Sequence, residues 1–504
     1  MNGEAAAGKM KYFLLSLFLT GLSLGGYLLA ADITYRLGFP LDDAWIHQTY
    51  ARNLAETGEW AFIPGVPSTG STSPGWTFLL ALGHLLRIPP LTWSNFIGWL
   101  IFIGLVIAGA TCYTRCIDRR DSSWIWAGLI LALEWHLVWA AGSGMETLIF
   151  TLFVVVGMIL TFDLRLGRGE SKKFDWKTWL GLGALTGGAI WVRPDGLTLL
   201  GVFGLVWLTY PGDWRAKAVS AGEFSAGFLL LFLPYLGFNY LLAGEIWPNT
   251  FYAKQAEYTV LQQTPFWVRF LEQSFLPFVG VEVVLLPGFV WQIIQSVRFS
   301  RWVQLVWGIW ILGYLGLYAW RLPVTYQHGR YVMPVIPIII LLGLPGIDEL
   351  GGRVSGSSAG RILMKSWKLT MAGVLVGFWF LGARAYSVDV AIIESEMVEA
   401  ARWIEANTES DALIAAHDIG ALGYFSKRKL IDLAGLVSPE VIPIMRNEAA
   451  LKDYLDSRRA DYLMTFPGWY PDLIREARLL YSTGGKFGPA QGGENMVIYR
   501  WEGR

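Results

Sequence analysis

Long apolar segments constrain the fold of this chain more than any other feature of its sequence. A helix needs about 20 apolar residues to cross a bilayer, and about eleven segments approach or reach that length. They cover residues 11–31, 93–114, 123–141, 146–163, 178–192, 196–210, 219–242, 275–296, 302–320, 331–347 and 368–384. Since 54% of the 504 residues are hydrophobic, the chain is predicted to be a polytopic α-helical membrane protein with about eleven transmembrane helices.

Basic residues predict how these helices are oriented. A further apolar segment, residues 74–87, would reach only about 21 Å as a helix, against a bilayer core of about 30 Å. If that segment lies in the membrane interface, the basic clusters share one side, which the positive-inside rule assigns to the cytoplasm. We therefore predict a multi-pass protein of the cytoplasmic membrane whose polar loops face the extracytoplasmic side. The clusters fall at residues 9–11, 115–120, 165–177, 215–217, 298–301 and 353–368.

The composition changes after residue 384. Residues 385–504 contain no apolar run of membrane length. Helical periodicity over 394–407 precedes short apolar segments at 412–416, 429–433 and 462–465 that are typical of buried strands, and 496–501 is suited to close a sheet. The sequence thus predicts two domains, a membrane domain over 1–384 and a soluble α/β domain over 385–504, the second also extracytoplasmic.

Two adjacent carboxylates, Asp42 and Asp43, follow the first apolar segment at the predicted membrane edge. Charged groups are costly there unless water, a cation or a substrate meets them. One aspartate is suited to cap the helix that follows. A second one, with His47 a turn later, exceeds what capping requires. We predict that one carboxylate removes a proton from an acceptor hydroxyl, while the other orients that hydroxyl or binds a cation.

Other polar residues of the outer loops have structural as well as functional interpretations. Arg52 is placed like a solvated interfacial arginine. Glu146 begins a span, where an acidic residue interacts favourably with the helix dipole. Arg193 and Asp195 flank a proline between two short spans, so an ion pair that ends a helix is the structural alternative to a substrate site.

Two later loops carry cations suited to a phosphate. Lys254 shares an aromatic loop with Asn249 and Tyr252, and His328 and Arg330 lie at the start of the tenth span. A guanidinium is the best-shaped partner of a phosphate, although lipid headgroups bind the same residues. No nucleotide, Cys/His metal or serine-hydrolase motif is present. Forty basic residues balance forty acidic ones, which does not indicate a nucleic-acid partner.

The ordered set of loop motifs resembles the GT-C-fold glycosyltransferases that use polyprenyl-phosphate sugars. It is most similar to the terminal arabinofuranosyltransferase family of the mycobacterial cell wall. The resemblance begins with Asp42-Asp-Ala-Trp-Ile-His47 and continues through residues 71–77, 143–147, 193–196, 248–254, 329–331 and 432–436.

This resemblance implies a GT-C membrane domain with interfacial helices in the first outer loop. It also implies a polyprenyl-phosphate-linked sugar as donor and transfer outside the membrane, usually with inversion. The catalytic base then lies in the acidic pair, with Asp42 narrowly favoured over Asp43. Lys254, His328 and Arg330 are candidates for the donor phosphate. The remaining substrate-binding candidates are His47, Arg52, Glu146, Arg193, Asp195, Asn249 and Tyr252.

The sequence does not identify the sugar, hexose or pentose, nor whether the acceptor is a glycan, a lipid or a protein. No cofactor is predicted beyond the donor, and a divalent cation at the acidic pair stays open. The main alternative is a transporter or flippase of lipid-linked sugars. It predicts polar residues at mid-membrane depth on several spans. Because the charged motifs cluster on one face, we favour an enzyme.

Overall fold

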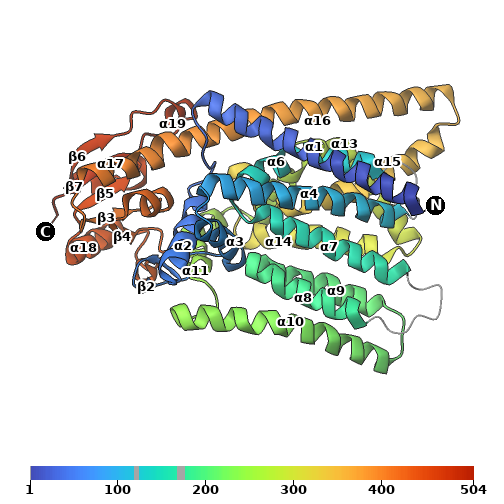
Figure 1. Ribbon diagram of the computed structural model, residues 1–504, viewed down its shortest axis with the longest axis horizontal. Helices are drawn as coiled ribbons and strands as arrows, with labels where there is room; N and C mark the ends of the chain where they lie inside the picture. Colours follow the sequence, from blue (N-terminus) through green and yellow to red (C-terminus); the bar gives the residue numbers. More distant parts are fainter. Residues whose placement is uncertain (1, 118–123, 167–175, 504) are drawn as a thin grey trace.

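The computed structural model describes residues 2–117, 124–166 and 176–503. It is a bundle of long, roughly aligned helices with a small sheet at one end, as Figure 1 shows. The N-terminus lies at the opposite end of the bundle from the sheet. The basic residues expected at 118–120 and 168–173 lie outside the described residues.

Each segment that was expected to span the membrane is mainly helical where it is described. Seven of the described helices are long and apolar enough to cross a membrane, or nine if each of two bent pairs is one span. The unbent helices of the bundle are α1 (Asn2–Thr34), α4 (Pro90–Ile117), α7 (Thr147–Leu166), α8 (Trp176–Val192), α9 (Leu199–Thr209), α10 (Trp214–Ala243), α14 (Trp302–Arg321), α15 (Ile336–Val354) and α16 (Ser358–Ile393).

The two bent pairs change direction where a single straight span was expected. Helices α5 (Trp124–Leu133) and α6 (Trp135–Gly142) meet at 56°. Glu134 lies between them, and its carboxylate accepts hydrogen bonds from the first backbone N–H groups of α6, so it caps a new helix start. Helix α12 (Phe266–Phe275) and its short extension to Phe278 meet α13 (Glu282–Arg298) at 109°.

The first outer loop contains the two short helices that the sequence predicted. Helix α2 (Asp43–Thr57) and helix α3 (Pro74–Leu85) contact each other and are joined by a small hairpin of β1 (Ala61–Ile63) and β2 (Val66–Pro67). Together with α11 (Asn249–Glu257) they lie between the bundle and the sheet (Figure 1).

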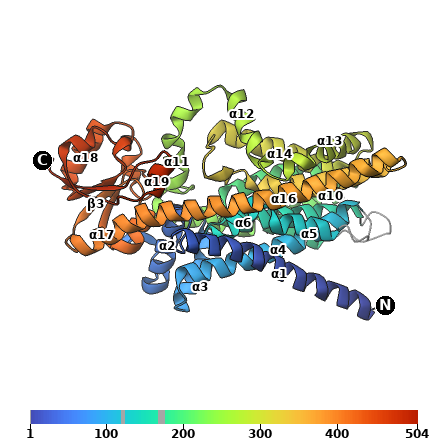
Figure 2. The ribbon, with the colours of Figure 1, turned by 90° about the horizontal axis from the view of Figure 1, so that it is seen from above.

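Helix α16 passes residue 384 without a break and continues through one wide turn into α17 (Glu399–Asn407). Figure 2 shows α16 running along the bundle and α17 reaching the sheet. We call residues 399–501 the sheet domain. Its five strands have the order β4-β3-β5-β7-β6, with β3 parallel to β4 and β5, and β7 antiparallel to β5 and β6. Helix α18 (Glu448–Arg458) completes an α/β arrangement.

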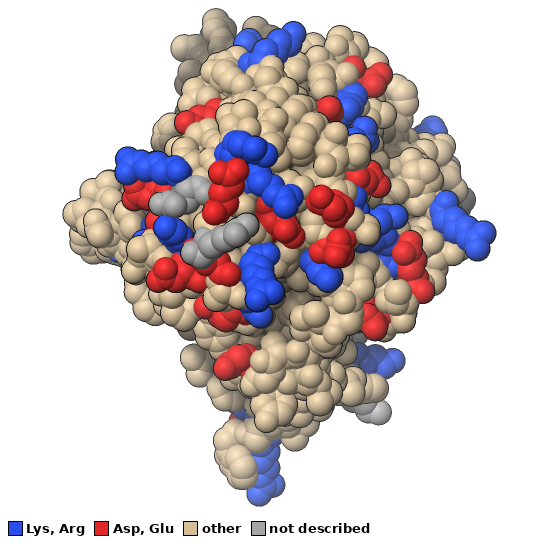
Figure 3. Space-filling view, turned by 90° about the vertical axis from the view of Figure 1, so that its left-hand side faces the viewer, with Lys and Arg blue, Asp and Glu red and all other residues tan. Residues whose placement is uncertain are grey.

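The expected strands are present as β3 (Leu413–Ala416), β4 (Lys429–Asp432), β5 (Tyr462–Thr465) and β7 (Val497–Trp501). Strand β6 (Ala477–Ser482) was not expected, because most of its residues are exposed and it therefore lacks a buried apolar pattern. The outer face of this end of the molecule carries interspersed acidic and basic side chains (Figure 3), which is typical of a surface in water.

Glycines allow α8 and α10 to approach closely. A Cβ atom on Gly183 would lie 2.0 Å from the carbonyl oxygen of Phe224, and one on Gly227 would lie 2.2 Å from that of Leu180. Backbone-to-backbone contact of this kind holds helices together in a bilayer, where no hydrophobic force drives them into contact. Gly181, on the same helix as Gly183, has open space beside it.

We expect Gly183→Ala to destabilise the protein, because either α8 or α10 must move to admit the added methyl group. Overpacking of this kind costs about 1–3 kcal/mol. Thermal unfolding of the purified protein in detergent, followed by tryptophan fluorescence, measures the effect. Gly181→Ala is the matched control and should leave the unfolding temperature unchanged or slightly higher, because alanine favours the helix. An equal fall for both variants would contradict the packing contact.

Candidate active site

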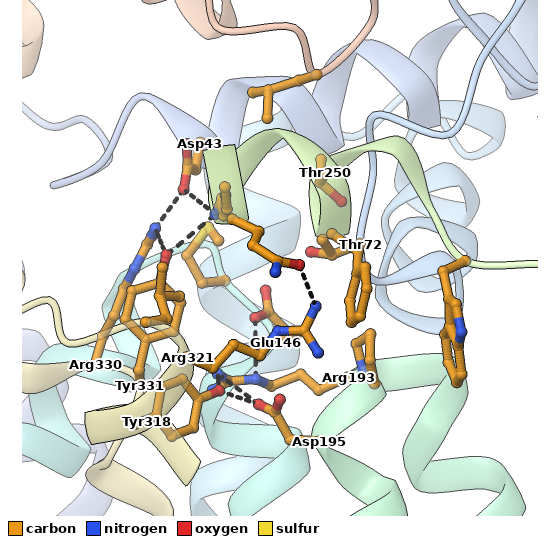
Figure 4. Close-up of a pocket in the computed structure, with 18 of the residues that line it drawn as sticks. Asp43, Thr72, Glu146, Arg193, Asp195, Thr250, Tyr318, Arg321, Arg330 and Tyr331 are labelled. Carbon is orange, nitrogen blue, oxygen red and sulfur yellow. Dashed lines mark hydrogen bonds and ion pairs between the residues drawn. The ribbon is translucent and has the colours of Figure 1, made fainter. Parts of the chain in front are cut away.

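A cavity of about 450 Å³ opens at the end of the bundle, beside the first outer loop. Its walls come from α2, α11, the end of α14 and the short helix η2 (Pro194–Thr198), together with the segment before α15. Figure 4 shows charged and aromatic side chains from these elements pointing toward one another. The predicted site residues that line it are Asp43, His47, Glu146, Arg193, Asp195, Lys254 and Arg330.

One wall of this cavity is an ion cluster around Asp43, the first residue of α2. The Asp43 Oδ2 atom lies 2.5 Å from Nη2 of Arg330 and 3.8 Å from Nζ of Lys254. Both cations also donate to the hydroxyl of Tyr331, over 3.0 and 3.1 Å. Burial alone would raise the pKa of Asp43, but the positive charges of Arg330 and Lys254 outweigh it and hold that pKa below its usual range. Asp43 is therefore an anion at neutral pH.

Arg330 retains hydrogen-bonding capacity. Only 5% of its surface is exposed, yet Nε and Nη1 have no hydrogen-bond partner among the described residues. Buried polar groups in proteins are nearly always partnered, so free guanidinium donors on a cavity wall indicate a missing ligand. The ammonium of Lys254 lines the same cavity and lies 3.8 Å from the same Asp43 carboxylate, and together the two cations form a site for an anion.

A second cluster lies around Arg193, in the break between α8 and η2. Its Nη2 atom is 2.9 Å from Oδ2 of Asp195 and donates to the hydroxyl of Tyr318 over 2.8 Å. Its Nε atom is 3.8 Å from Glu146. The Tyr318 hydroxyl also donates to Asp195. The ion pair weighed from the sequence therefore exists, but it faces the cavity rather than only ending a helix.

His47 connects the first loop to this cluster. Its Nε2 atom lies 3.6 Å from Glu146, and its Nδ1 atom lies 3.0 Å from the hydroxyl of Ser71. Burial lowers the pKa of His47, although Glu146 partly opposes this effect. The other Glu146 oxygen pairs with Arg193, whereas Oε2 has no hydrogen-bond partner among the described residues. That carboxylate oxygen is available to a hydroxyl group in the cavity.

Asp42 points away from this cavity. Its carboxylate accepts hydrogen bonds from the backbone N–H groups of Gly420 and Ala421, over 2.7 and 2.8 Å. It makes no side-chain capping bond to its own helix α2. Gly420 approaches so closely that a Cβ there would lie 2.0 Å from the Asp42 carbonyl oxygen. Burial, with the negative charge of Asp418, raises the pKa of Asp42 to about 8. Asp42 thus holds the sheet domain to the first loop.

Four other sequence candidates do not line the cavity. Arg52 donates to the backbone oxygen of Tyr424 over 2.7 Å, and so contacts the sheet domain. Asn249 and Tyr252 lie on α11, the helix that brings Lys254 to the site, but neither lines it. His328 lies 2.7 Å from Asp389 and lines a neighbouring cavity of about 420 Å³.

The structure adds residues that the sequence did not single out. Tyr331 and Tyr318 lie between the two charged clusters, with their rings stacked 5.6 Å apart. Arg321, at the end of α14, packs over the ring of Phe251 and donates to Gln255. Aromatic residues at span ends are common in membrane proteins, so the sequence alone gave no reason to select these. Among the described residues, no group of three or more His, Cys, Asp or Glu side chains is placed to hold a metal ion.

Solved structures share this architecture. ArnT from Cupriavidus metallidurans, bound to undecaprenyl phosphate, matches with a TM-score of 0.60 at 14% identity, over 96% of this chain and 97% of that one. The oligosaccharyltransferase of Archaeoglobus fulgidus matches with 0.64 at 11% identity, over 93% and 70%. AglB from the same organism has been solved with an inhibitory peptide and a dolichol-phosphate. These likenesses show that the chain has the predicted GT-C fold.

Mycobacterial arabinofuranosyltransferase AftD matches with a TM-score of 0.47 at 13% identity, over 95% of this chain and 41% of that one. A family model described as a domain of unknown function (DUF8728) matches residues 388–499. No curated protein matches the sequence.

We expect Asp42→Ala to loosen the sheet domain, because two buried backbone N–H groups lose their acceptor. Leaving such groups unsatisfied costs about 1–3 kcal/mol each. Hydrogen exchange followed by mass spectrometry should show faster exchange at residues 418–426. The control is Asp411→Ala, which removes an exposed carboxylate from the same domain. Unchanged exchange in Asp42→Ala would show that the contact does not hold the domain.

Proposed function

We propose that this chain is a membrane glycosyltransferase that moves a sugar from a polyprenyl-phosphate donor to an acceptor hydroxyl. The observation that carries this proposal is the convergence on one cavity of a carboxylate, Asp43, with two cations, Lys254 and Arg330, the second of which has unpartnered N–H donors. ArnT binds undecaprenyl phosphate and AglB a dolichol-phosphate, and both have this fold. A lipid phosphate is therefore the anion that we assign to Lys254 and Arg330.

In this proposal the donor phosphate binds the unpartnered N–H groups of Arg330 and the ammonium of Lys254. Its sugar extends toward Glu146 and Arg193, where carboxylate oxygens and a guanidinium are able to hold sugar hydroxyls. As the bond between the anomeric carbon and the phosphate oxygen breaks, negative charge grows on the leaving phosphate. Arg330 and Lys254 are already in position, so they stabilise that charge without any rearrangement of the site. Because the leaving group is a polyprenyl phosphate, the reaction needs no nucleotide-linked sugar.

We propose Asp43, rather than Asp42, as the base. Asp43 faces the cavity, whereas the Asp42 oxygens are occupied by backbone N–H groups. Asp43 accepts the proton of the acceptor hydroxyl as that oxygen attacks the anomeric carbon, which inverts the configuration there. Before the donor binds, Arg330 and Lys254 hold the pKa of Asp43 low. A phosphate between these cations offsets their charge, so binding of the donor raises the basicity of Asp43.

The extracytoplasmic orientation also belongs to this proposal. Helix α14 begins after Arg301 and ends at Arg321, which lines the cavity. Helix α15 follows Arg330 and ends at Val354, beside Arg353. The basic clusters at 298–301 and 353–368 therefore lie at the end of the bundle away from the cavity. The positive-inside rule assigns that end to the cytoplasm. The charged groups that line the cavity lie at one end of the bundle, and this favours chemistry over transport.

We expect Asp43→Asn to reduce sugar transfer by about 10²–10⁴-fold, the usual contribution of a general base. Reconstituted protein supplied with polyprenyl-phosphate sugars and a cell-envelope extract as acceptor would show this as lost radiolabel transfer. Asp42→Asn is the matched control; it keeps one oxygen that accepts a backbone N–H group of the sheet domain, and it should retain most of the turnover. A larger loss in Asp42→Asn than in Asp43→Asn would reverse the assignment.

We expect Arg330→Gln to weaken the binding of undecaprenyl phosphate by about tenfold or more, because a charge-assisted bond to phosphate is lost. Native mass spectrometry of the detergent-purified protein, titrated with the lipid, measures the bound fraction. His328→Gln, two residues away but beside a different cavity, should bind the lipid like the wild type. If only His328→Gln lost the lipid, the phosphate site would lie in the neighbouring cavity instead.

A further inference from the structure

A second and larger cavity, of about 1050 Å³, lies between the bundle and the sheet domain. It shares part of its wall with the first cavity, including Asp43, Lys254 and Arg330. Asp43 thus faces two spaces from one position. The proposed donor binds in the first cavity, so a different ligand is needed to explain the second.

The sheet domain supplies an aromatic wall to this second cavity. Trp469 is 48% exposed, so much of its ring system is open to a ligand. Edge-to-face contacts with His417 at 4.8 Å and with Phe466 at 5.1 Å fix the orientation of the ring. An exposed aromatic ring on the wall of a cavity is able to pack against an apolar surface of a ligand.

Carboxylates and hydrogen-bonding groups flank this ring. Asp418 Oδ2 is buried and has no hydrogen-bond partner among the described residues. Glu257, one turn after Lys254 on α11, lies 3.6 Å from Nε2 of His417. Nδ1 of the same histidine lies 2.8 Å from the hydroxyl of Tyr470. The histidine is therefore held on both sides, while the Asp418 oxygen remains available as an acceptor.

An exposed aromatic ring and an unpaired carboxylate oxygen in one cavity match the surface of a sugar ring. The C–H groups of a pyranose or furanose form an apolar face that packs on an indole, and its hydroxyls donate to carboxylates. Pockets that bind small polar ligands combine aromatic walls with a few such placed polar groups. Trp469 and Asp418 present both features on one wall of one cavity.

We propose that the sheet domain is an acceptor-recognition module that binds a saccharide in the second cavity, with Trp469 packing against the sugar ring and Asp418 accepting one of its hydroxyls. This inference rests on the proposed glycosyltransferase function. The bound saccharide presents another hydroxyl to Asp43. Its O–H proton passes to the Asp43 carboxylate, its oxygen bonds to the anomeric carbon of the donor sugar, and the polyprenyl phosphate leaves with the electron pair of the broken C–O bond.

Saturation-transfer-difference NMR on the full-length protein in detergent tests this proposal without requiring turnover. The probes are short soluble oligosaccharides of arabinose, galactose, mannose and glucose, with a serine- and threonine-rich peptide as the alternative class. At least one oligosaccharide should bind through its ring protons. Trp469→Ala should weaken that binding by about tenfold or more, and Trp469→Phe should restore most of it, because an aromatic face is retained.

Leu479→Ala is the matched control, since it removes an exposed apolar side chain from β6 of the same domain, away from the cavity. It should leave oligosaccharide binding unchanged. Binding of the peptide alone, binding of no oligosaccharide, or equal binding by the wild type and Trp469→Ala would each overturn the proposal. Undecaprenyl phosphate titrated into Trp469→Ala should still bind as in the wild type. Loss of lipid binding by the wild type itself would instead count against the proposed donor.

Discussion

The contact of Asp43 with Arg330 and Lys254 determines how the rest of the site is arranged. These three residues come from α2, α11 and the segment before α15, which are distant in the sequence. A buried arginine is costly unless it is paired. Asp43 satisfies one of the arginine nitrogens and leaves two others free. The same ion pair that joins the three segments therefore also orients free donors toward the cavity.

Asp42 and Asp43 are adjacent in the sequence, but their side chains diverge at the start of α2. One carboxylate enters the cavity, and the other binds the backbone of the sheet domain at Gly420 and Ala421. A shift of the sheet domain would therefore act on the residue next to the proposed base. One peptide bond joins Asp42 to Asp43, so the position of the sheet domain is linked to the position of Asp43 in the cavity.

The sequence predicted much of the fold because spanning helices follow from apolar length. The side of the membrane that each loop faces stays a prediction from charge. The sequence also predicted that Asp43, Lys254 and Arg330 lie together, which depended on the order of the loop motifs. It could not predict that Asp42 binds backbone groups at residues 420–421, because N–H groups have no sequence signature. His328 illustrates the same limit, since its partner Asp389 lies in α16.

The roles of the site residues remain predictions from this geometry. The aromatic residues Tyr318 and Tyr331 show most clearly what the sequence could not supply. Each resembles an ordinary interfacial tyrosine in its local sequence, and only the three-dimensional arrangement places it between charged groups. The bend before α13 was also missed, because the apolar residues continue on both sides of it.

The helix that runs from Ser358 to Asn407 is continuous over 50 residues, so a tilt at one end moves the other end. At about 1.5 Å per residue it is about 75 Å long, and a tilt of about 5° at its base displaces its tip by about 6 Å. Helices tilt in response to bilayer thickness. A change in the tilt of this helix would therefore strain the hydrogen bonds by which Asp42 holds the sheet domain to the first outer loop.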